Sequence, residues 1–140
     1  MKIAIGCDHG GIALKNVILS LLSELGHEIS DQGTDSEISV DYPRYAKSVC
    51  DLVAANACDC GILICGTGIG MSMAANRNNK IRAALCGDLY TARLSREHNN
   101  ANVLCLGARV TGPGLAEEIV RVWLSTEFAG DRHLRRIEMF

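Results

Sequence analysis

Short runs of apolar residues alternate along this chain with longer segments in which apolar residues recur at helical spacing. The short runs predict five strands, at residues 2–7, 27–30, 61–65, 81–86 and 103–106. The longer segments predict five helices, at residues 11–25, 43–56, 69–76, 89–97 and 114–125. Gly26 ends the first of these helices, and Pro43 suits the first turn of the second. The chain therefore alternates strand and helix along almost its whole length.

This alternation predicts a single α/β domain over residues 1–140. Strands joined by helices form parallel sheets with right-handed crossovers. The strand at 61–65 is apolar throughout, as expected where helices cover both faces of a sheet. We expect a three-layer α/β/α sandwich around a five-stranded, parallel, doubly wound (Rossmann-like) sheet. Ligands of such sheets bind beyond the carboxyl ends of the strands, where the strand order reverses.

Composition and charge exclude several classes of protein. A chain of 140 residues with 48% hydrophobic residues can bury a substantial core, so disorder is excluded. The 14 Lys and Arg against 16 Asp and Glu leave a net charge of −2, which is no footprint for nucleic acid or an anionic membrane. An anion site therefore has to be local, and neither nucleic acid nor a membrane is expected as a partner.

The cysteines indicate a reducing compartment. Only five uncharged residues separate Lys2 from Asp8, too few for the core of a signal peptide, and no segment has the composition of a membrane span. Seven cysteines without a secretory signal are typical of reduced thiols. Cys58 and Cys60 form the only close pair, so no structural zinc is expected. We therefore expect a cytoplasmic protein without a metal site.

Two loops that follow predicted strands contain reactive side chains. The first is Asp8-His9-Gly10-Gly11, in which Asp8 either caps the next helix or points with His9 into the expected crevice. The second is CGTGIG at 65–70, whose alternating glycines let backbone N–H groups converge on an anion. This loop lacks the Walker and GxGxxG patterns, and Met71 stands where a Cys-based phosphatase loop has its arginine. Cys65 at a helix N-terminus is therefore the candidate functional thiol, because oriented N–H dipoles favour thiolates.

Further polar candidates lie in the second half of the chain. His98 and Asn99 follow the predicted helix at 89–97, where a lone histidine is more often a C-terminal cap. Arg109 comes just after the last strand, on the expected ligand side. A basic cluster at 130–136 is by default a solvated tail. Arg132 and Arg136 are four apart, however, so one helical turn would direct both toward a single phosphate.

Taken together, these motifs resemble the type B ribose-5-phosphate isomerase family. DHGG at 8–11, DYP at 41–43, CGTGIG at 65–70, SREHN at 95–99 and a GRH-like DRH at 131–133 follow the family's order and spacing. The resemblance implies a cofactor-free isomerase that interconverts ribose 5-phosphate and ribulose 5-phosphate through a cis-enediolate, in the non-oxidative pentose phosphate pathway. It also implies a homodimer, or a dimer of dimers, with each active site built from two subunits. Asp131 departs from the pattern, because glycine usually precedes the Arg-His pair.

The resemblance also implies roles for individual residues. Cys65 is the base that moves a proton between C1 and C2, Thr67 orients the thiolate, and His98 with Asp8 opens the furanose ring. The backbone amides of 66–70 hold the developing negative charge. The implied substrate-binding residues are Asp8, His9, Gly66, Thr67, Gly68, Ile69, Gly70, Asn99, Arg109, Arg132 and Arg136.

Three other functions stay open at this point. An isomerase of allose or galactose 6-phosphate would differ only in sugar length, which depends on the depth of the pocket. A nucleotide-binding module would have GxGxxG after its first strand, a pattern that residues 6–11 do not supply. A receiver-like signalling domain would end its third strand in a phosphoacceptor aspartate, where this chain has Cys65. The sequence thus favours a sugar-phosphate isomerase.

Overall fold

A sheet of five parallel strands lies at the centre of the structure, a computed structural model that describes residues 1–140. The strands are β1 (Lys2–Cys7), β2 (Glu28–Asp31), β3 (Cys60–Cys65), β4 (Ala83–Leu85) and β5 (Val103–Gly107). Their order across the sheet is β2-β1-β3-β5-β4, and each neighbouring pair is parallel. The predicted five-stranded, parallel, doubly wound sheet is confirmed.

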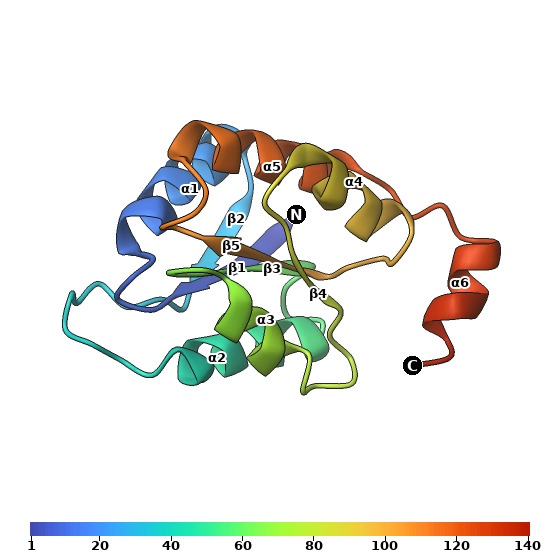
Figure 1. The fold of residues 1–140 in the computed structure, drawn as a ribbon, viewed down its shortest axis with the longest axis horizontal. Helices are drawn as coiled ribbons and strands as arrows, with labels where there is room; N and C mark the ends of the chain where they lie inside the picture. Colours follow the sequence, from blue (N-terminus) through green and yellow to red (C-terminus); the bar gives the residue numbers. More distant parts are fainter.

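Helices cover both faces of this sheet (Figure 1). One layer holds α1 (Ile12–Glu24), α4 (Leu89–Glu97) and α5 (Pro113–Ser125). The other layer holds α2 (Tyr42–Ala54) and α3 (Ile69–Ala75). These five helices match the predicted ones to within a few residues at each end. None of the helices has both the length and the apolar character that crossing a membrane would require.

Two apolar clusters join the layers to the sheet, and β3 contributes alternate residues to each. Ile62 and Ile64 belong to the cluster under α1, α4 and α5, together with the buried Trp123. Leu63 and Cys65 belong to the cluster under α2 and α3. All six residues of β3 are buried, and the side-chain period of two explains the alternation. Cys65 therefore faces the α2 and α3 side at the carboxyl end of the central strand.

The chain diverges after β1 and β3, which are neighbours in the sheet. The segment after β1 enters α1 in one layer, and the segment after β3 enters α3 in the other (Figure 1). A Cβ on Gly11 would lie 2.7 Å from the carbonyl oxygen of Ile64, so only glycine lets the loop after β1 rest on β3. This is the point where strand order reverses, and it is the expected place for a ligand.

Two features differ from the prediction. β4 is shorter than the predicted strand at 81–86, because the N–H of Arg82 donates to Asn102 Oδ1 at 2.8 Å instead of to a strand. The basic cluster at the C-terminus forms the helix α6 (Arg132–Ile137), which projects from one end of the molecule (Figure 1). The segment before α6 is attached to the end of α4, because Ala129 N–H donates to the carbonyl of Glu97 at 2.9 Å.

Candidate active site

Cys65 lies at the carboxyl end of β3 with its sulfur held by a backbone donor. The N–H of Gly68 donates to Cys65 Sγ over 3.1 Å, and only 5% of Cys65 is exposed. Gly68 has a φ of +77°, in the left-handed region that favours glycine, and this turn directs its N–H toward the sulfur. A hydrogen bond to a charged acceptor is stronger than one to a neutral acceptor. The Gly68 N–H is therefore placed to donate to a thiolate at Cys65.

Some backbone N–H groups around Cys65 have a hydrogen-bond partner within the chain, and others have none. Thr67 Oγ1 accepts from the N–H of Ile69 at 3.3 Å, and Thr67 makes no hydrogen bond to the sulfur. The contact expected of the Thr67 hydroxyl is thus made by the Gly68 amide. The N–H groups of Gly66, Thr67 and Gly70 have no hydrogen-bond partner within the chain. They are the donors that this loop can offer to an anionic ligand.

The other six cysteines are held as protonated thiols. Burial raises the pKa of Cys7 and of Cys50 to about 11, and that of Cys60 to about 12. Burial likewise raises the pKa of the remaining thiols, Cys58, Cys86 and Cys105. These six thiols are therefore unreactive near neutral pH.

Asp8 and His9 lie directly after β1, beside the Cys65 loop. Asp8 Oδ1 accepts from the N–H of Gly10 at 2.9 Å, and only 7% of the residue is exposed. Gly11 is the N-cap of α1 and receives no side-chain bond, so Asp8 does not cap this helix. His9 Nδ1 accepts from the N–H of Val40 at 3.2 Å. This contact links His9 to the loop between β2 and α2, which the sequence analysis had not connected to the site.

Arg109 joins the two loops. Its N–H donates to the carbonyl of Gly66 at 2.9 Å. Its side chain extends over both loops, since a Cβ on Gly66 would lie 3.5 Å from Arg109 Nε and one on Gly10 would lie 3.7 Å from Nη2. We refer to Asp8, His9, the loop 65–70 and Arg109 as the carboxyl-edge group. The ring of Tyr42, from the DYP motif, also packs against Gly70 in this region.

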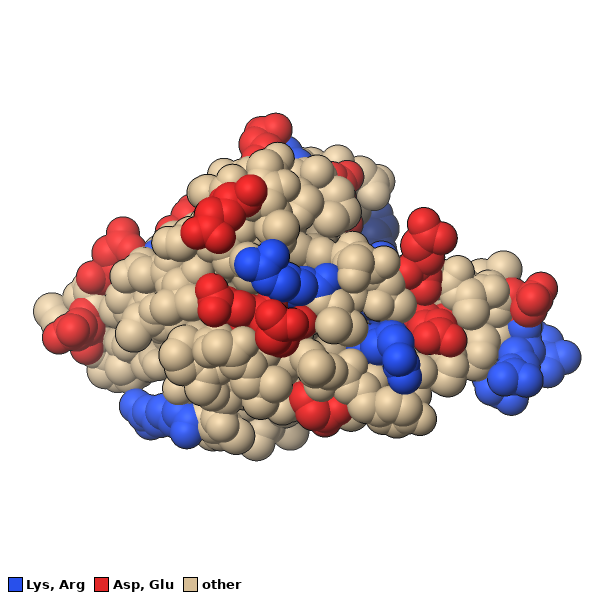
Figure 2. Space-filling model, turned by 90° about the horizontal axis from the view of Figure 1, so that it is seen from above, with Lys and Arg blue, Asp and Glu red and all other residues tan.

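A second set of candidates gathers where α4 ends and α6 begins. The rings of His98 and His133 are stacked, with centroids 4.1 Å apart and planes 8° apart. Burial, followed by electrostatic interactions with His98, Arg132 and Arg136, lowers the pKa of His133. Arg132 and Arg136 are exposed on α6, and blue side chains mark that end of the molecule in Figure 2. We refer to His98, Asn99, Arg132, His133 and Arg136 as the amino-edge group.

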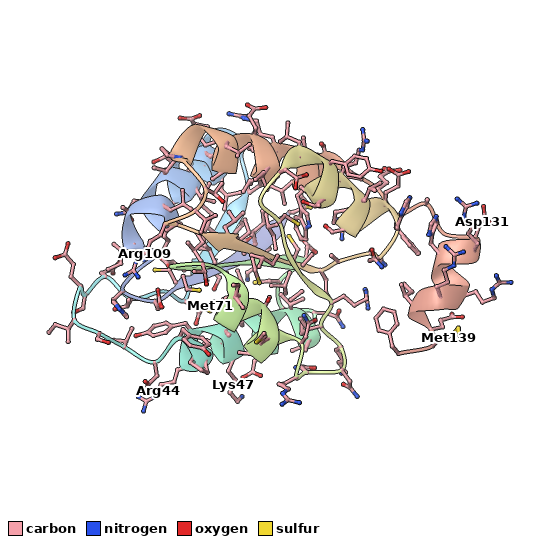
Figure 3. The ribbon with its side chains drawn as sticks, in the orientation of Figure 1. Arg44, Lys47, Met71, Arg109, Asp131 and Met139 are labelled. Carbon is pink, nitrogen blue, oxygen red and sulfur yellow. The ribbon has the colours of Figure 1, made fainter.

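The two groups lie at opposite ends of the sheet. Cys65 pairs with Gly107 at the end of β5, whereas His98 precedes Val103 at its start. The four residue steps of β5 at 3.3 Å each put about 13 Å between these edges. Figure 3 shows Arg109 toward one end of the molecule and Asp131, the neighbour of Arg132, at the other. The expected contact between Asp8 and His98 is therefore absent within one chain, and the two groups can meet only between two copies.

A cavity of about 610 Å³ adjoins the amino-edge group. It lies between α6, β4 and the loop after α3, and its lining includes Arg77, Arg82, Asn99, Ile137 and Phe140. No residue of the carboxyl-edge group lines it. Nowhere in the chain do three His, Cys, Asp or Glu side chains lie together as a metal site would require.

The fold and these two groups of residues define a class of sugar-phosphate enzymes, and comparison with known proteins identifies the family. The family model described as Ribose/Galactose Isomerase matches residues 3–140. Ribose-5-phosphate isomerase B of Escherichia coli is 51% identical over 98% of this chain and 92% of its own length. D-erythrulose-4-phosphate isomerase of Pectobacterium atrosepticum is 43% identical over 99% and 91%. This chain therefore belongs to the ribose/galactose isomerase family, and it is an isomerase.

Solved structures agree with this assignment. Ribose-5-phosphate isomerase B of Clostridium thermocellum superposes with a TM-score of 0.98 at 52% identity, covering 99% of this chain and 94% of that one. The ribose 5-phosphate isomerase of Thermotoga maritima gives 0.97 at 54% identity, covering 99% and 95%. The resemblance noted from the motifs is thus confirmed at the level of the family and of the fold.

Proposed function

We propose that this isomerase interconverts ribose 5-phosphate and ribulose 5-phosphate in the non-oxidative pentose phosphate pathway, with Cys65 as the base. The observation that carries the proposal is the Gly68 N–H bonded to Cys65 Sγ at 3.1 Å, at the carboxyl end of the central strand. Relatives at about half identity are named for this substrate, which supports the choice of sugar. All seven cysteines are free thiols, which fits a reducing cytoplasm.

The proton transfer follows from the chemistry of a carbonyl. In open-chain ribose 5-phosphate the Cys65 thiolate removes the proton from C2, and the electron pair moves toward the C1 carbonyl to give a cis-enediolate. The free N–H groups of Gly66, Thr67 and Gly70 stabilise the negative charge as it develops. The C2 hydroxyl passes its proton to the oxygen on C1, and the thiol returns the carbon-bound proton to C1 as the C2–O bond becomes the new carbonyl. One proton moves from C2 to C1 and one from O2 to O1, so no redox partner is needed.

The amino-edge group of a second copy completes this site. Furanose ribose 5-phosphate hides its carbonyl, and opening the ring needs an acid and a base near neutral pH. An imidazole can act in either role, so we assign ring opening to His98 of that copy, with Asp8 of the first copy assisting. Asn99 binds sugar hydroxyls, and Arg132 and Arg136 bind the phosphate with Arg109 and His9. The active unit is accordingly a homodimer, alone or paired with a second dimer.

The length of the sugar is the part of the proposal for which the comparisons offer an alternative. The Pectobacterium relative is named for a four-carbon sugar phosphate at 43% identity, so relatives of similar identity act on sugars of different length. Allose 6-phosphate and galactose 6-phosphate are the longer alternatives. The depth of the assembled pocket decides among these sugars, and that depth is set jointly by both groups of residues.

A coupled isomerase assay tests both the proposed substrate and the role of Cys65 as the base. With EDTA present, we expect the highest kcat/KM for ribose 5-phosphate among pentose, tetrose and hexose phosphates. Cys65→Ala should lower kcat by about 10² to 10⁴-fold, the usual contribution of a positioned proton-transfer group. A Cys65→Ala variant that retains a tenth of the activity would exclude Cys65 as the base. A preference for a hexose or tetrose phosphate would mean that ribose 5-phosphate is not the substrate, but it would not contradict the proposed role of Cys65.

His98→Asn separates ring opening from proton transfer. Ribulose 5-phosphate enters as an open chain, so its exchangeable proton should still exchange with deuterated solvent in His98→Asn. The same exchange should disappear in Cys65→Ala. Loss of exchange in both variants would assign His98 to the proton-transfer step.

A further inference from the structure

Lys15 is a buried cation that the proposed chemistry leaves without a role. Its side chain on α1 is 0% exposed. Its Nζ donates to Asp31 Oδ2 at 2.9 Å, to Asp35 Oδ1 at 2.8 Å and to the carbonyl of Thr34 at 3.4 Å. Burial alone would lower the pKa of Lys15, but the bonds to Asp35 and Asp31 raise it above its usual value. The ammonium is therefore charged, and all three of its hydrogens are used.

These contacts attach the start of the loop between β2 and α2 to α1, and backbone bonds attach it to the sheet. Gln32 N–H donates to the carbonyl of Ile5 at 2.7 Å, and Thr34 N–H donates to the carbonyl of Cys7 at 3.2 Å. Asp31 also accepts the N–H of Gly33 through Oδ1 at 2.8 Å. The segment 31–35 is thus fixed to the carboxyl end of β1. Residues 36–41 continue beyond this anchor toward the carboxyl-edge group.

The far end of the same loop binds His9. Val40 N–H donates to His9 Nδ1 at 3.2 Å, so this nitrogen must present a lone pair. The neutral imidazole therefore carries its proton on Nε2. Between the anchor and Val40 the backbone is shaped by two short turns, in which Thr34 Oγ1 accepts from Ser36 N–H and Ser36 Oγ accepts from Ile38 N–H.

We infer that Lys15 and its partner Asp35 are positioning residues that hold the loop 32–41 on His9, and that this loop fixes His9 as the Nε2–H tautomer. His9 then presents a hydrogen-bond donor to the sugar phosphate. Its use in substrate binding rests on the proposed function, whereas its tautomer does not. A buried lysine suits this task because it joins the Asp31 carboxylate at the end of β2 to the Thr34 carbonyl and the Asp35 carboxylate of the loop.

Two variants and one matched control test the inference. Lys15→Met removes the ammonium and keeps an unbranched chain. Asp35→Ala removes a side chain that is 88% exposed, so its fold is preserved even if Lys15→Met unfolds. The control is Lys47→Met, which breaks the Lys47–Asp51 pair of 2.6 Å on the outer face of α2. Nitrogen-15 NMR of labelled histidine reads the tautomer, with His9→Gln assigning the His9 signals.

The expected result is a change confined to the loop variants. In Asp35→Ala and Lys15→Met the fixed Nε2–H pattern of His9 should be lost, while Lys47→Met keeps it. KM for ribose 5-phosphate should rise by roughly 2- to 12-fold, the worth of one hydrogen bond, with kcat nearly unchanged.

An unchanged His9 pattern in folded Asp35→Ala would overturn the inference. A changed pattern with an unchanged KM would confirm the anchor and remove His9 from substrate binding, which is a failure of the proposed function alone. If the wild-type protein has no isomerase activity, the proposed function fails, and the NMR result alone tests the anchor of the loop on His9.

Discussion

Mixing two inactive variants should restore activity if each active site contains residues of two copies. In a hybrid dimer of Cys65→Ala with His98→Asn, one site carries both substitutions and the other carries neither. Random pairing makes about half of the dimers hybrid, so about a quarter of all sites should be intact. The structure is the reason to expect a divided site, because about 13 Å of β5 separates the edge that bears Cys65 from the edge that bears His98.

The assay requires real exchange of subunits. The two variants are unfolded together in urea, refolded at equal concentrations and assayed with ribose 5-phosphate, and hybrid formation is verified by native mass spectrometry. A second mixture of Cys65→Ala with Arg109→Ala is the control, since both of these residues lie on the carboxyl edge. Every site in that hybrid contains one of the two substitutions, so its activity should not exceed the mean of the parents.

Two results would refute the shared site. One is a mixture of Cys65→Ala and His98→Asn that stays at the parental level although hybrids have formed. The other is a monomer with full activity in sedimentation experiments. Either result would mean that His98 does not act on the sugar bound at Cys65 of another copy.

Two further predictions concern single positions. Iodoacetamide at pH 8 should alkylate Cys65 first, and substrate should protect it. The reason is that burial raises the pKa of Cys7 to about 11 and that of Cys60 to about 12. Mass spectrometry that finds another cysteine modified first would contradict this prediction. Asp131→Gly should raise the free energy of unfolding in urea by about 1 kcal/mol, because Asp131 has φ +47° and ψ −123°, a conformation that glycine adopts without strain. Unchanged or lower stability would show that Asp131 is not strained.

The fold was predictable because local pattern and global topology agree. The strand at 61–65 is apolar at every position, and it forms the central β3 with all residues buried. Helical spacing gave the limits of five helices to within a few residues. β4 was overestimated because hydrophobicity does not show that Arg82 N–H bonds to the side chain of Asn102. Such a bond depends on a residue twenty positions away.

The candidate site was predictable as a set of residues but not as an arrangement. Cys65 and Asp8 could be found because strand ends and glycine loops have local signatures. His98 comes before β5, whereas Cys65 and Asp8 lie at or after the ends of their strands, so a parallel sheet puts His98 at the opposite edge, a consequence of topology that the motifs alone do not show. The bond from Val40 to His9 spans 31 residues and has no sequence signal. His133 was visible only as part of the DRH motif, and its stacking on His98 needed the structure.

In the proposed dimer, a site divided between two chains would link assembly to substrate binding. A sugar phosphate that contacts Cys65 of one copy and Arg132 of another binds the dimer better than either monomer, so it stabilises the dimer by mass action. Each half is already formed in a single chain, since Gly68 holds the Cys65 sulfur and His133 stacks on His98. Association of two chains would then require little further ordering of these side chains. Asp131, with its positive φ, lies where α6 begins at the end of the molecule, and α6 carries the exposed Arg132 and Arg136. In the proposed dimer, the geometry that separates the two groups within one chain is therefore the geometry that lets each chain contribute to the site of the other.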